Sequence, residues 1–436
     1  MIFRPSHFTF FERETCKPML IEKFITYTAK KKNATYLQFF TPETPVVPER
    51  QTDLPMLLYV HVPFCEELCP YCSFNRVVFR EDLARIYFDA LRKEIIMYRD
   101  LGYAFNGLYV GGGTPTVLID ELAETIDLIR QIYPIQEISV ETNPNHLTES
   151  NFQILKESGV NRLSVGVQTF NNDLLKAIER YHKYGSGEEI VDRIRAAQGI
   201  FQTLNIDMIF NFPTQTIPIL ERDLSTLIDL EVDQITYYPL MVSTSTQAVM
   251  KRKLGIVNYD RGRSYYNKIV SMLLPRYHHS TAWCFSRAQA SIDEYVVNYE
   301  EYAGLGSGSI GYLAGSAYAN TFDIQEYVAK INRGIMPIAG KKEFSIKERL
   351  RYDFLMKLFG MKLDLDHLNT RYRIKIYKHL WPEITFFRLV GGLKKLGNVL
   401  VLTERGQYYW VLMMREFFIG VNNFRDFCRA ELLGKN

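Results

Sequence analysis

Short apolar runs alternate with longer amphipathic stretches from Leu57 to Pro275. The runs have the length of strands, and the stretches between them have the length and periodicity of helices. In chain order the predicted strands and helices are MLLYVHV and 81–101, GLYV and 119–132, EISVET and 148–158, RLSVGV and 171–199, NIDMIF and 217–229, and QITYYPL and 261–273. This alternation predicts a parallel sheet with right-handed crossovers, either doubly wound or curled into a full or partial barrel.

The alternation is absent on both sides of this region. The first residues mix helical and irregular signals and end in the proline-rich TPETPVVPERQTD, which blocks regular structure. Beyond Pro275, the glycine-rich and aromatic segment 299–315 predicts a turn-laden hairpin. From about 341 the pattern predicts helices and then a small hairpin around Gly397 and Asn398, which resembles a winged-helix unit. The expected divisions are an N-terminal extension at 1–52, the core at 53–275, the hairpin and its connection at 276–340, and the winged-helix-like domain at 341–436.

Polar or unusual residues recur at the carboxyl ends of successive predicted strands. Three cysteines follow the first strand, and GGGTP follows the second. Glu141 closes the third strand, Gln168 closes the fourth, and Asp207 lies within the fifth. In doubly wound sheets and in barrels the functional site lies at this edge. The pattern therefore predicts one shared site.

Composition and charge narrow the class of protein. The 436 residues, 47% hydrophobic and 23% charged, are ordinary for a folded chain of two or three domains. A net charge of +3 is well short of the dense basic stripe of a nucleic-acid binder, so we expect no nucleic-acid partner and a lid or docking role for the winged-helix-like domain. The opening MIFRPSHFTFFERETC lacks a leader pattern, and no run reaches the ~18 apolar residues of a membrane span. We therefore expect a cytoplasmic protein.

The stretch YVHVPFCEELCPYCSFN places Cys65, Cys69 and Cys72 together after the first strand. Three bunched thiols among six in a long chain make a poor disulfide framework and favour a metal site in a reducing compartment. Thiolates suit zinc, copper(I) and iron–sulfur clusters. A structural zinc needs a fourth ligand such as His61, which could equally be a packed strand residue. A four-iron cluster held by three cysteines leaves one iron open, as catalysis requires, and the spacing favours this option.

The cysteine spacing, the preceding YVHVPF and the following VGGGTPT together resemble the radical S-adenosylmethionine (SAM) superfamily, and specifically the branch of oxygen-independent coproporphyrinogen III oxidase and its relatives. The resemblance covers residues 55–315 closely and the carboxyl-terminal domain more loosely. It implies a partial (β/α)6 TIM-like radical SAM barrel and a 4Fe–4S cluster held by Cys65, Cys69 and Cys72. It also implies that SAM binds the open iron and is cleaved to methionine and a 5′-deoxyadenosyl radical. The electron would come from an external donor of the flavodoxin or ferredoxin type.

The resemblance further assigns SAM-contacting positions, and it leaves the catalytic residues unassigned. Tyr59 and Tyr71 match aromatic residues beside the cluster and SAM. A glycine-rich segment, whose missing side chains let backbone groups approach the methionine end of SAM, is matched by Gly111, Gly112, Gly113 and Thr114. The remaining matches are Glu141, Gln168, Arg180 and Asp207.

Phe74 marks a departure from the family's best-known activity. The decarboxylating oxidase has a fourth cysteine at this position and an amino-terminal signature that CKPMLIEKFITYTAKKK does not reproduce. Its relatives include haem chaperones, haem-degrading methyltransferases and methyltransferases that use two SAM molecules.

We expect a radical SAM enzyme that acts on a porphyrin-type, tetrapyrrole-like or similar planar substrate by hydrogen abstraction or radical methyl transfer. A haem-binding trafficking protein is the alternative. A tetrapyrrole suits an aromatic, moderately basic pocket in which arginines pair with propionates. Candidates for that role are Arg261, Arg263 and Arg287.

Overall fold

The structure, a computed structural model, describes residues 12–49, 54–288 and 295–433. The six predicted strands form the parallel centre of a 12-stranded sheet, in which each pairs with the next in chain order. They are β1 (Met56–Val62), β4 (Gly107–Gly112), β5 (Glu137–Thr142), β6 (Arg162–Gln168), β7 (Thr203–Phe210) and β8 (Gln234–Pro239). Their sequential parallel order confirms the expected partial barrel.

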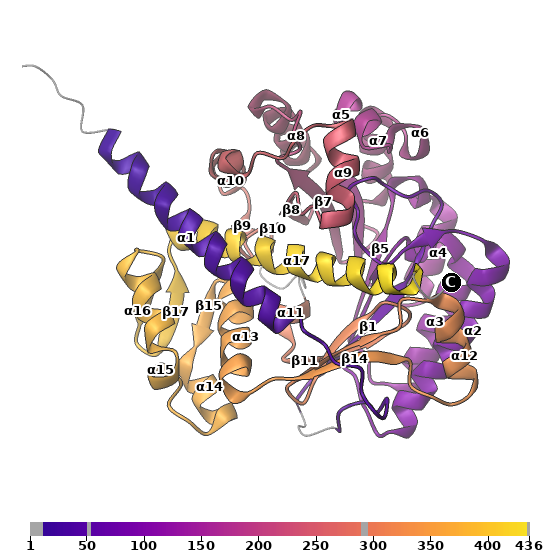
Figure 1. The fold of residues 1–436 in the computed structure, drawn as a ribbon. Coiled ribbons are helices and arrows are strands. Elements are labelled where there is room, and N and C mark those ends of the chain that lie inside the picture. Colours follow the sequence, from indigo (N-terminus) through magenta and orange to yellow (C-terminus); the bar gives the residue numbers. More distant parts are fainter. Residues whose placement is uncertain (1–11, 50–53, 289–294, 434–436) are drawn as a thin grey trace, which may run out of the picture.

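Amphipathic helices connect these strands and cover the outer face of the sheet (Figure 1). They are α2 (Glu81–Asp100), α3 (Ile119–Ile132), α4 (Glu149–Glu157), α7 (Gly187–Ala197), α8 (Ile217–Leu230) and α10 (Gly262–Leu273). The stretch 171–199, predicted as one helical segment, is instead divided into α5 (Asn172–Ala177), α6 (Tyr181–Tyr184) and α7. The breaks occur where Glu179 and Gly185 adopt φ angles of 59° and 93°, which no helix allows.

Further strands extend the sheet at both edges. The glycine-rich segment supplies β11 (Glu301–Leu305), which pairs in parallel with β1. Antiparallel neighbours follow as β12 (Ile310–Leu313), β13 (Ser316–Asn320) and β14 (Ile338–Glu343). At the opposite edge, β10 (Cys284–Ser286) and β9 (His278–His279) follow β8. The sheet therefore continues well past the predicted sixth strand–helix pair.

The carboxyl-terminal region is helical with a small hairpin, as predicted. Its short helices are α13 (Ile346–Phe359), α14 (Leu365–Tyr372), α15 (Ile376–His379) and α16 (Trp381–Leu389). The hairpin around Gly397 joins β16 (Leu393–Leu396) to β17 (Val399–Leu402), and β15 (Lys362–Asp364) completes a three-stranded sheet.

A long final helix, α17 (Glu404–Leu433), then crosses the molecule in front of the barrel, and α1 (Glu12–Tyr36) packs against it (Figure 1). Smaller elements complete the described chain. They are β2 (Phe64–Cys65), β3 (Val77–Val78), α9 (Thr244–Lys253), α11 (Tyr295–Asn298), α12 (Ile324–Asn332) and three 3-10 turns at Pro115–Leu118, Pro144–His146 and Tyr259–Arg261.

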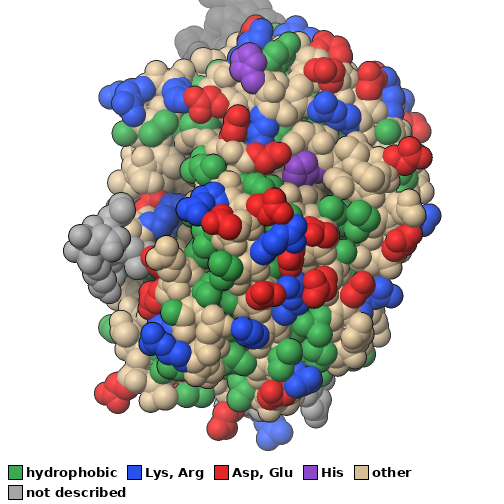
Figure 2. All heavy atoms as spheres, turned by 90° about the vertical axis from the view of Figure 1, so that its right-hand side faces the viewer, with side chains coloured by type: hydrophobic (Ala, Val, Ile, Leu, Met, Phe, Trp, Pro, Cys, Tyr) green, Lys and Arg blue, Asp and Glu red, His purple; other side chains and the backbone are tan. Residues whose placement is uncertain are grey.

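Charges of both signs are interspersed on the face that α2 and α3 form (Figure 2). Arg85 pairs there with Glu81, Asp120 and Glu121, and Arg92 pairs with Asp89 and Glu121. This mixed pattern agrees with the modest net charge of the sequence.

Most of the opening segment MIFRPSHFTFFERETC, which lacks a leader pattern in the sequence, lies outside the described residues. The side chain of Cys16 lies outside them too. In the ranges that are described, every helix is too short or too polar to cross a bilayer.

Glu94 of α2 is a buried carboxyl that fastens the turn before β12 to the barrel. Its oxygens accept hydrogen bonds from Gly306 N at 2.8 Å, the Tyr327 hydroxyl at 2.6 Å and Asn320 Nδ2 at 3.0 Å. Burial outweighs these hydrogen bonds and raises the pKa of Glu94 to about 7. The folded state therefore holds this proton more tightly than the unfolded chain does.

We predict that this carboxyl destabilises the fold as pH rises. Below the unfolded pKa of 4.5 both states are protonated and the effect is absent, and above the folded pKa of about 7 it reaches its full size. The expected loss is about 3 kcal/mol in the free energy of unfolding between about pH 4 and about pH 8. Glu94→Gln should remove this component in urea titrations, whereas Glu149→Gln, at an exposed position, should keep it. An unchanged pH dependence in Glu94→Gln would contradict the prediction.

Candidate functional site

A cavity of about 360 Å³ lies at the carboxyl edge of the parallel strands and collects the predicted site residues. Of the residues predicted to hold the cluster or to contact SAM, every one lines it except Gly111. They are Tyr59, Cys65, Cys69, Tyr71, Cys72, Gly112, Gly113, Thr114, Glu141, Gln168, Arg180 and Asp207. Residues that recur at one strand edge in the sequence are therefore brought to one place by the fold.

All three thiols of the cysteine motif line this cavity. Cys65 closes β2, whose backbone pairs with β3, and Cys72 N donates to the carbonyl of Cys69 at 3.3 Å. Within the described ranges, no three His, Cys, Asp or Glu side chains are placed to share a single metal ion. A cubane cluster does not need such convergence, because each cysteine binds a different iron. Burial and the neighbouring Cys72 raise the pKa of Cys65 to about 11, so a metal must replace its proton.

Arg76 braces the cysteine loop, and the sequence reasoning missed it. Its Nη2 donates to the carbonyls of Cys69 and Cys72, at 2.6 Å each. Its Nε and Nη1 are buried and find no acceptor among the described groups. A guanidinium with two spare donors beside three thiols fits an anionic thiolate-bound cluster, since it supplies compensating charge and hydrogen bonds. The sequence feature that could have indicated this role is the position of Arg76, four residues after the last cysteine of the motif.

His61, considered as a possible zinc ligand, is a packing residue. Its Nε2 donates to the carbonyl of Asn75 at 2.8 Å, so its Nδ1 accepts from the Tyr59 hydroxyl at 2.9 Å. Burial lowers the pKa of His61 to about 4, which keeps the ring neutral. Both ring nitrogens are thus occupied by the protein.

The glycine-rich segment closes on the cysteine loop and on Glu141. A Cβ atom on Gly113 would lie 2.5 Å from the Phe64 carbonyl oxygen and 3.0 Å from Cys65 Sγ. One on Gly112, whose φ is +120°, would lie 2.7 Å from the ring of His61. A Cβ atom on Gly111 would lie 2.9 Å from the Glu141 carboxyl. This contact explains why glycine is needed at position 111, although Gly111 does not itself line the cavity. The missing side chains therefore let the backbone approach the thiols and the carboxylate.

Two partly buried carboxyls line the cavity on neighbouring parts of the sheet. Glu141 accepts hydrogen bonds from the Tyr109 hydroxyl at 2.8 Å and Gly112 N at 3.1 Å, and burial raises its pKa. Asp207 accepts from the Ser164 hydroxyl at 2.7 Å and Asn205 Nδ2 at 2.8 Å, and burial raises its pKa to about 7. A carboxylate can accept about four hydrogen bonds, so both groups retain capacity for the hydroxyl or ammonium groups of a ligand.

Arg180 links the cysteine loop to the strands. It lies at the start of α6 and is 3% exposed. It donates to Asn143 Oδ1 at 3.0 Å, to the carbonyl of Gly166, and to Cys69 Sγ and the Tyr71 hydroxyl at 3.4 Å each. Arg180 therefore stabilises the position of the cysteine loop against the strands, in addition to its predicted contact with SAM. Gln168, the last residue of β6, adopts a φ of 75°, at the point where the pairing of β6 with β7 shifts register.

The three arginines proposed as partners for propionates lie outside the cavity, so that expectation is wrong. Arg287 donates to the carbonyl of Glu231 at 2.6 Å. Arg263 pairs with Glu22 and lies over the ring of Tyr408. Arg261 donates to carbonyls at the end of β7, among them that of Phe212 at 3.2 Å. Each is engaged elsewhere, since Arg261 and Arg263 lie at the start of α10 and Arg287 directly follows β10 near one edge of the sheet.

Helix α17 forms a second wall of the cavity, which no feature of the sequence predicts. It contributes Phe417, Phe418, Val421, Asn422 and Arg425 to the lining. A helix more than 300 residues beyond the cysteines in the chain thereby covers the site from the side opposite the sheet.

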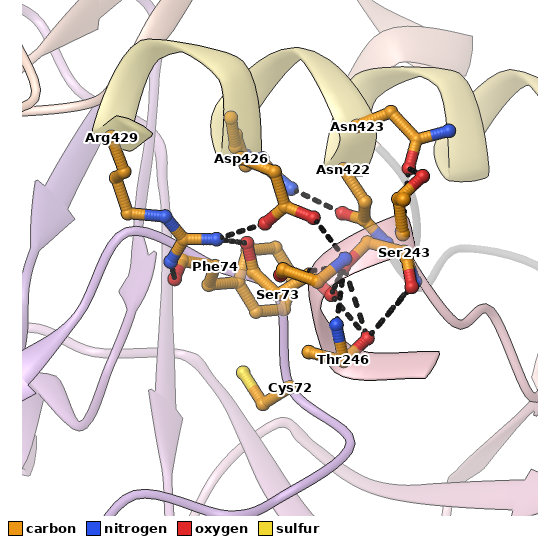
Figure 3. Close-up of polar contacts among 12 residues, drawn as sticks. Cys72, Ser73, Phe74, Ser243, Thr246, Asn422, Asn423, Asp426 and Arg429 are labelled. Atoms are coloured by element: carbon orange, nitrogen blue, oxygen red, sulfur yellow. Dashed lines mark hydrogen bonds and ion pairs between the residues drawn. The ribbon is translucent and has the colours of Figure 1, made fainter. Parts of the chain in front are cut away.

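The end of α17 is fastened to the cysteine loop and to α9 by polar contacts (Figure 3). Arg429 Nη1 donates to the carbonyl of Phe74 at 2.9 Å, and its Nη2 pairs with Asp426 at 2.6 Å. Asp426 also accepts from Ser245 N at 2.9 Å, in the first turn of α9. The Ser73 hydroxyl donates to Ser243 Oγ at 2.9 Å, which closes the circuit between the loop and α9. We call this set of contacts the latch.

Asp426→Asn should loosen the latch. The substituted amide keeps one acceptor oxygen, but its NH2 group would face either Ser245 N–H or the Arg429 guanidinium, which are both donors. We expect amide hydrogen exchange at residues 73–76 to accelerate roughly tenfold or more, the equivalent of one lost charged hydrogen bond. Phe427→Ala, at a 59% exposed position of the same helix, is the control and should leave that exchange unchanged. Equal protection in Asp426→Asn and the wild type would show that the latch does not order the loop.

Comparison with known proteins gives one family and two kinds of named relative. The family model described as the radical SAM superfamily matches residues 59–227. The haem chaperone HemW of Bacillus subtilis (strain 168) is 30% identical over 314 residues, which is 69% of this chain and 82% of the chaperone. The oxygen-independent coproporphyrinogen III oxidase of Pseudomonas aeruginosa is 24% identical over 390 residues, which is 82% of this chain and 84% of that protein.

Among solved structures, the coproporphyrinogen III oxidase (HemN) of Escherichia coli, described as a radical SAM enzyme, shares the fold. The TM-score is 0.70 at 22% identity, over 85% of this chain and 91% of that one. The similarity therefore extends well beyond residues 59–227, which the family model matches.

Proposed function

The chain belongs to the radical SAM superfamily, and from this premise we propose that it is an enzyme acting on a porphyrin-type or similar planar substrate. Like the rest of the superfamily it uses a 4Fe–4S cluster and SAM, and when both are bound and an external donor supplies an electron, they provide the 5′-deoxyadenosyl radical. One observation carries the proposal. The cysteines, the glycine segment and the partly buried carboxyls line a single cavity that also has an aromatic wall.

In this proposal Cys65, Cys69 and Cys72 hold the cluster. Arg76 keeps the loop closed through the two cysteine carbonyls, and its buried Nε and Nη1 retain unused donors. Its positive charge, which interacts with all three cysteines, would stabilise the additional negative charge of the reduced state.

The polar side of the cavity would hold SAM. Backbone groups of Gly112 and Gly113 can approach the methionine end because no side chain intervenes. Glu141 accepts hydrogen bonds from an ammonium group, and Asp207 and Gln168 lie further along the sheet for the nucleoside. The other proposed contacts are Tyr59, Tyr71, Thr114 and Arg180.

The aromatic side would hold the substrate, and α17 would exclude water from it. Phe417 and Phe418 close the cavity opposite the sheet, so a carbon atom of a bound planar molecule is held against the polar side and away from solvent. Hydrogen abstraction and radical methyl transfer both need this arrangement, since a free radical would react with any accessible group.

A haem chaperone is the second candidate function. The relative named as a haem chaperone shares 30% identity with this chain over most of its length, and Phe74 stands where the oxidase carries a cysteine. Such a protein would bind the macrocycle and release it unchanged.

The test of the enzymatic proposal is SAM cleavage. Anaerobically reconstituted protein, reduced with dithionite or with a flavodoxin or ferredoxin, should convert SAM to 5′-deoxyadenosine and methionine. Product analysis against a panel of porphyrins and porphyrinogens should then reveal a change in mass that depends on SAM. An unchanged macrocycle that transfers to an acceptor protein would support the chaperone, and the absence of 5′-deoxyadenosine under all these conditions would contradict the enzyme.

A further inference from the structure

Helix α1 is apolar on the face that it buries and also on the face that it exposes to solvent. Ile25 is 3% exposed and packs into the core. On the other side, Leu20 is 65% exposed, Phe24 is 54% exposed and Tyr27 is 66% exposed. Their spacing of four and then three positions places the three side chains in one stripe along the helix. Isolated exposed apolar residues are ordinary, but a stripe of large ones marks a surface that another structure covers.

The stripe continues from α1 onto α16. The ring of Phe24 lies 5.5 Å from the ring of Phe386, measured between centroids. Leu389, three positions further along α16 and therefore on the neighbouring part of its surface, is 82% exposed. Met19, beside Leu20, is a further exposed apolar side chain of α1. We call these exposed residues of the two helices the apolar patch, which consists of Met19, Leu20, Phe24, Tyr27 and Leu389.

Positive charge accompanies the apolar patch along α1. Four lysines of this helix are exposed, namely Lys23, Lys30, Lys31 and Lys32. Lys31 lies four positions beyond Tyr27, on the face of the stripe. Among the residues that the structure describes, none of the four lysines pairs with a carboxylate. The acidic residue of the segment 19–36 is Glu22, which is already paired with Arg263. The charge of the four lysines is therefore available to a partner.

The two signs of charge are also segregated along the chain. Residues 341–436 contain 19 Lys and Arg against 10 Asp and Glu, whereas residues 53–340 contain 25 against 34. The barrel is thus acidic, and the carboxyl-terminal region against which α1 packs is basic. In Figure 1, α1 and α16 lie on the left, and the mixed-charge face of α2 and α3 lies on the right. One side of the molecule therefore combines positive charge with the apolar patch.

An anionic membrane surface fits this combination better than two other occupants do. Duplex nucleic acid would attract the lysines, but its phosphates and base edges offer mainly polar groups to the aliphatic side chains of Leu20 and Leu389. A second copy of this chain would cover the apolar patch, but it would add its own unpaired lysines to the same interface. A bilayer surface accepts apolar side chains at the level of its headgroups, and its anionic lipids attract the lysines.

We infer that α1 docks the protein onto an anionic phospholipid surface, with the apolar patch inserted among the headgroups and the four lysines in contact with their charges. The inference goes beyond the proposed function and does not depend on it. Helix α1 also reaches the cavity, because its last residue, Tyr36, lines it. At 1.5 Å per residue, Tyr36 lies about 14 Å along the helix from Tyr27, so docking would hold one wall of the cavity close to the lipid surface.

The test is co-sedimentation of the full-length reconstituted protein with lipid vesicles. Vesicles of phosphatidylglycerol and phosphatidylcholine in equal parts should bind the wild type, and vesicles of phosphatidylcholine alone should bind it roughly tenfold more weakly or less. Lys30→Gln/Lys31→Gln should weaken binding to the anionic vesicles roughly 25-fold, because each lysine near such a surface contributes about fivefold. Leu20→Ser/Tyr27→Ser should weaken it roughly tenfold or more at low and at high salt, since salt screens the charges and not the apolar contact.

Matched controls change the same kinds of residue on the barrel. Lys156→Gln/Lys176→Gln removes two exposed lysines, and Ile86→Ser removes an exposed apolar side chain of α2. Both should bind the anionic vesicles as the wild type does. Circular dichroism verifies that each variant is folded, and the lysine variant alone decides if Leu20→Ser/Tyr27→Ser is not.

Four results would overturn the inference. The first is a wild type that does not sediment with the anionic vesicles at about 0.1 M salt. The second is unchanged binding in Lys30→Gln/Lys31→Gln. The third is retention on duplex DNA without binding to vesicles, which would make this side a nucleic-acid surface. The fourth is a dimer that Leu20→Ser/Tyr27→Ser dissociates and that vesicles do not recruit, which would make the apolar patch a contact between two copies. SAM cleavage by the same preparations without vesicles tests the proposed function separately.

Discussion

Cys69→Ala is expected to abolish the visible absorbance of the reconstituted protein and to reduce 5′-deoxyadenosine formation to the detection limit. Three cysteines of the described chain line the cavity, so removing one leaves two irons without a cysteine ligand, and a cluster so held is lost during gel filtration. Iron and sulfide assays after reconstitution, together with the absorbance spectrum, measure the effect directly.

The matched control is Cys284→Ala, which removes a cysteine of β10 that likewise forms no disulfide. Cys284 accepts a hydrogen bond from the Thr236 hydroxyl and does not line the cavity, so its loss should cost about 1–2 kcal/mol of stability and no iron. If the two variants retain the same amount of iron, the three-cysteine site is not the cluster site.

The barrel and one side of its site could be predicted because both are encoded locally. Each strand is visible in the sequence as a short apolar run, and each helix as a repeat of apolar residues every three to four positions. Parallel strands then bring their carboxyl ends to the same edge of the sheet. Once Glu141 and Asp207 are recognised at such ends, their common location follows from topology alone. The spacing of the cysteines that begins at Cys65 predicts a thiolate-bound cluster at this edge, and this prediction requires no interatomic distances.

The opposite wall of the site could not be predicted, because it depends on contacts between distant parts of the chain. Phe417 and Arg425 are unremarkable positions of a long amphipathic helix, and nothing near them in the sequence indicates a cavity. Likewise β11 could be predicted as a strand, but its pairing with β1 depends on a return of the chain across the sheet. The choice of Arg287 as a carboxylate partner failed for the same reason.

Phe74 shows how these two kinds of information combine. The sequence marks it only as a departure from the oxidase, and the structure gives it two roles. Its ring supports Arg425, and its carbonyl accepts from Arg429, while the preceding residue Ser73 bonds to Ser243. Phe74 therefore connects the cysteine loop to α17.

Gly113→Ala is expected to displace the cysteine loop even though it removes no ligand. The added methyl group would lie 2.5 Å from the Phe64 carbonyl oxygen and 3.0 Å from Cys65 Sγ. Phe64 is buried and its backbone is paired with Val77, so it cannot yield, and Gly113 N is itself bonded to the carbonyl of Val62 at 2.8 Å. The overpacking should cost about 1–3 kcal/mol.

Because that strain acts directly on Cys65, we expect iron content to fall and the rate of 5′-deoxyadenosine formation to drop about 10- to 100-fold. Gly334→Ala is the matched control. Gly334 has a φ of +70° and open space around its Cβ position, so alanine there adds backbone strain of about 1 kcal/mol and no clash. If Gly334→Ala loses a similar amount of stability but keeps its full iron content, the loss of iron in Gly113→Ala is due to contact with the cysteine loop. Full iron and full rate in Gly113→Ala would instead mean that the loop can move away, and that the close approach seen here is not needed to hold Cys65 in place.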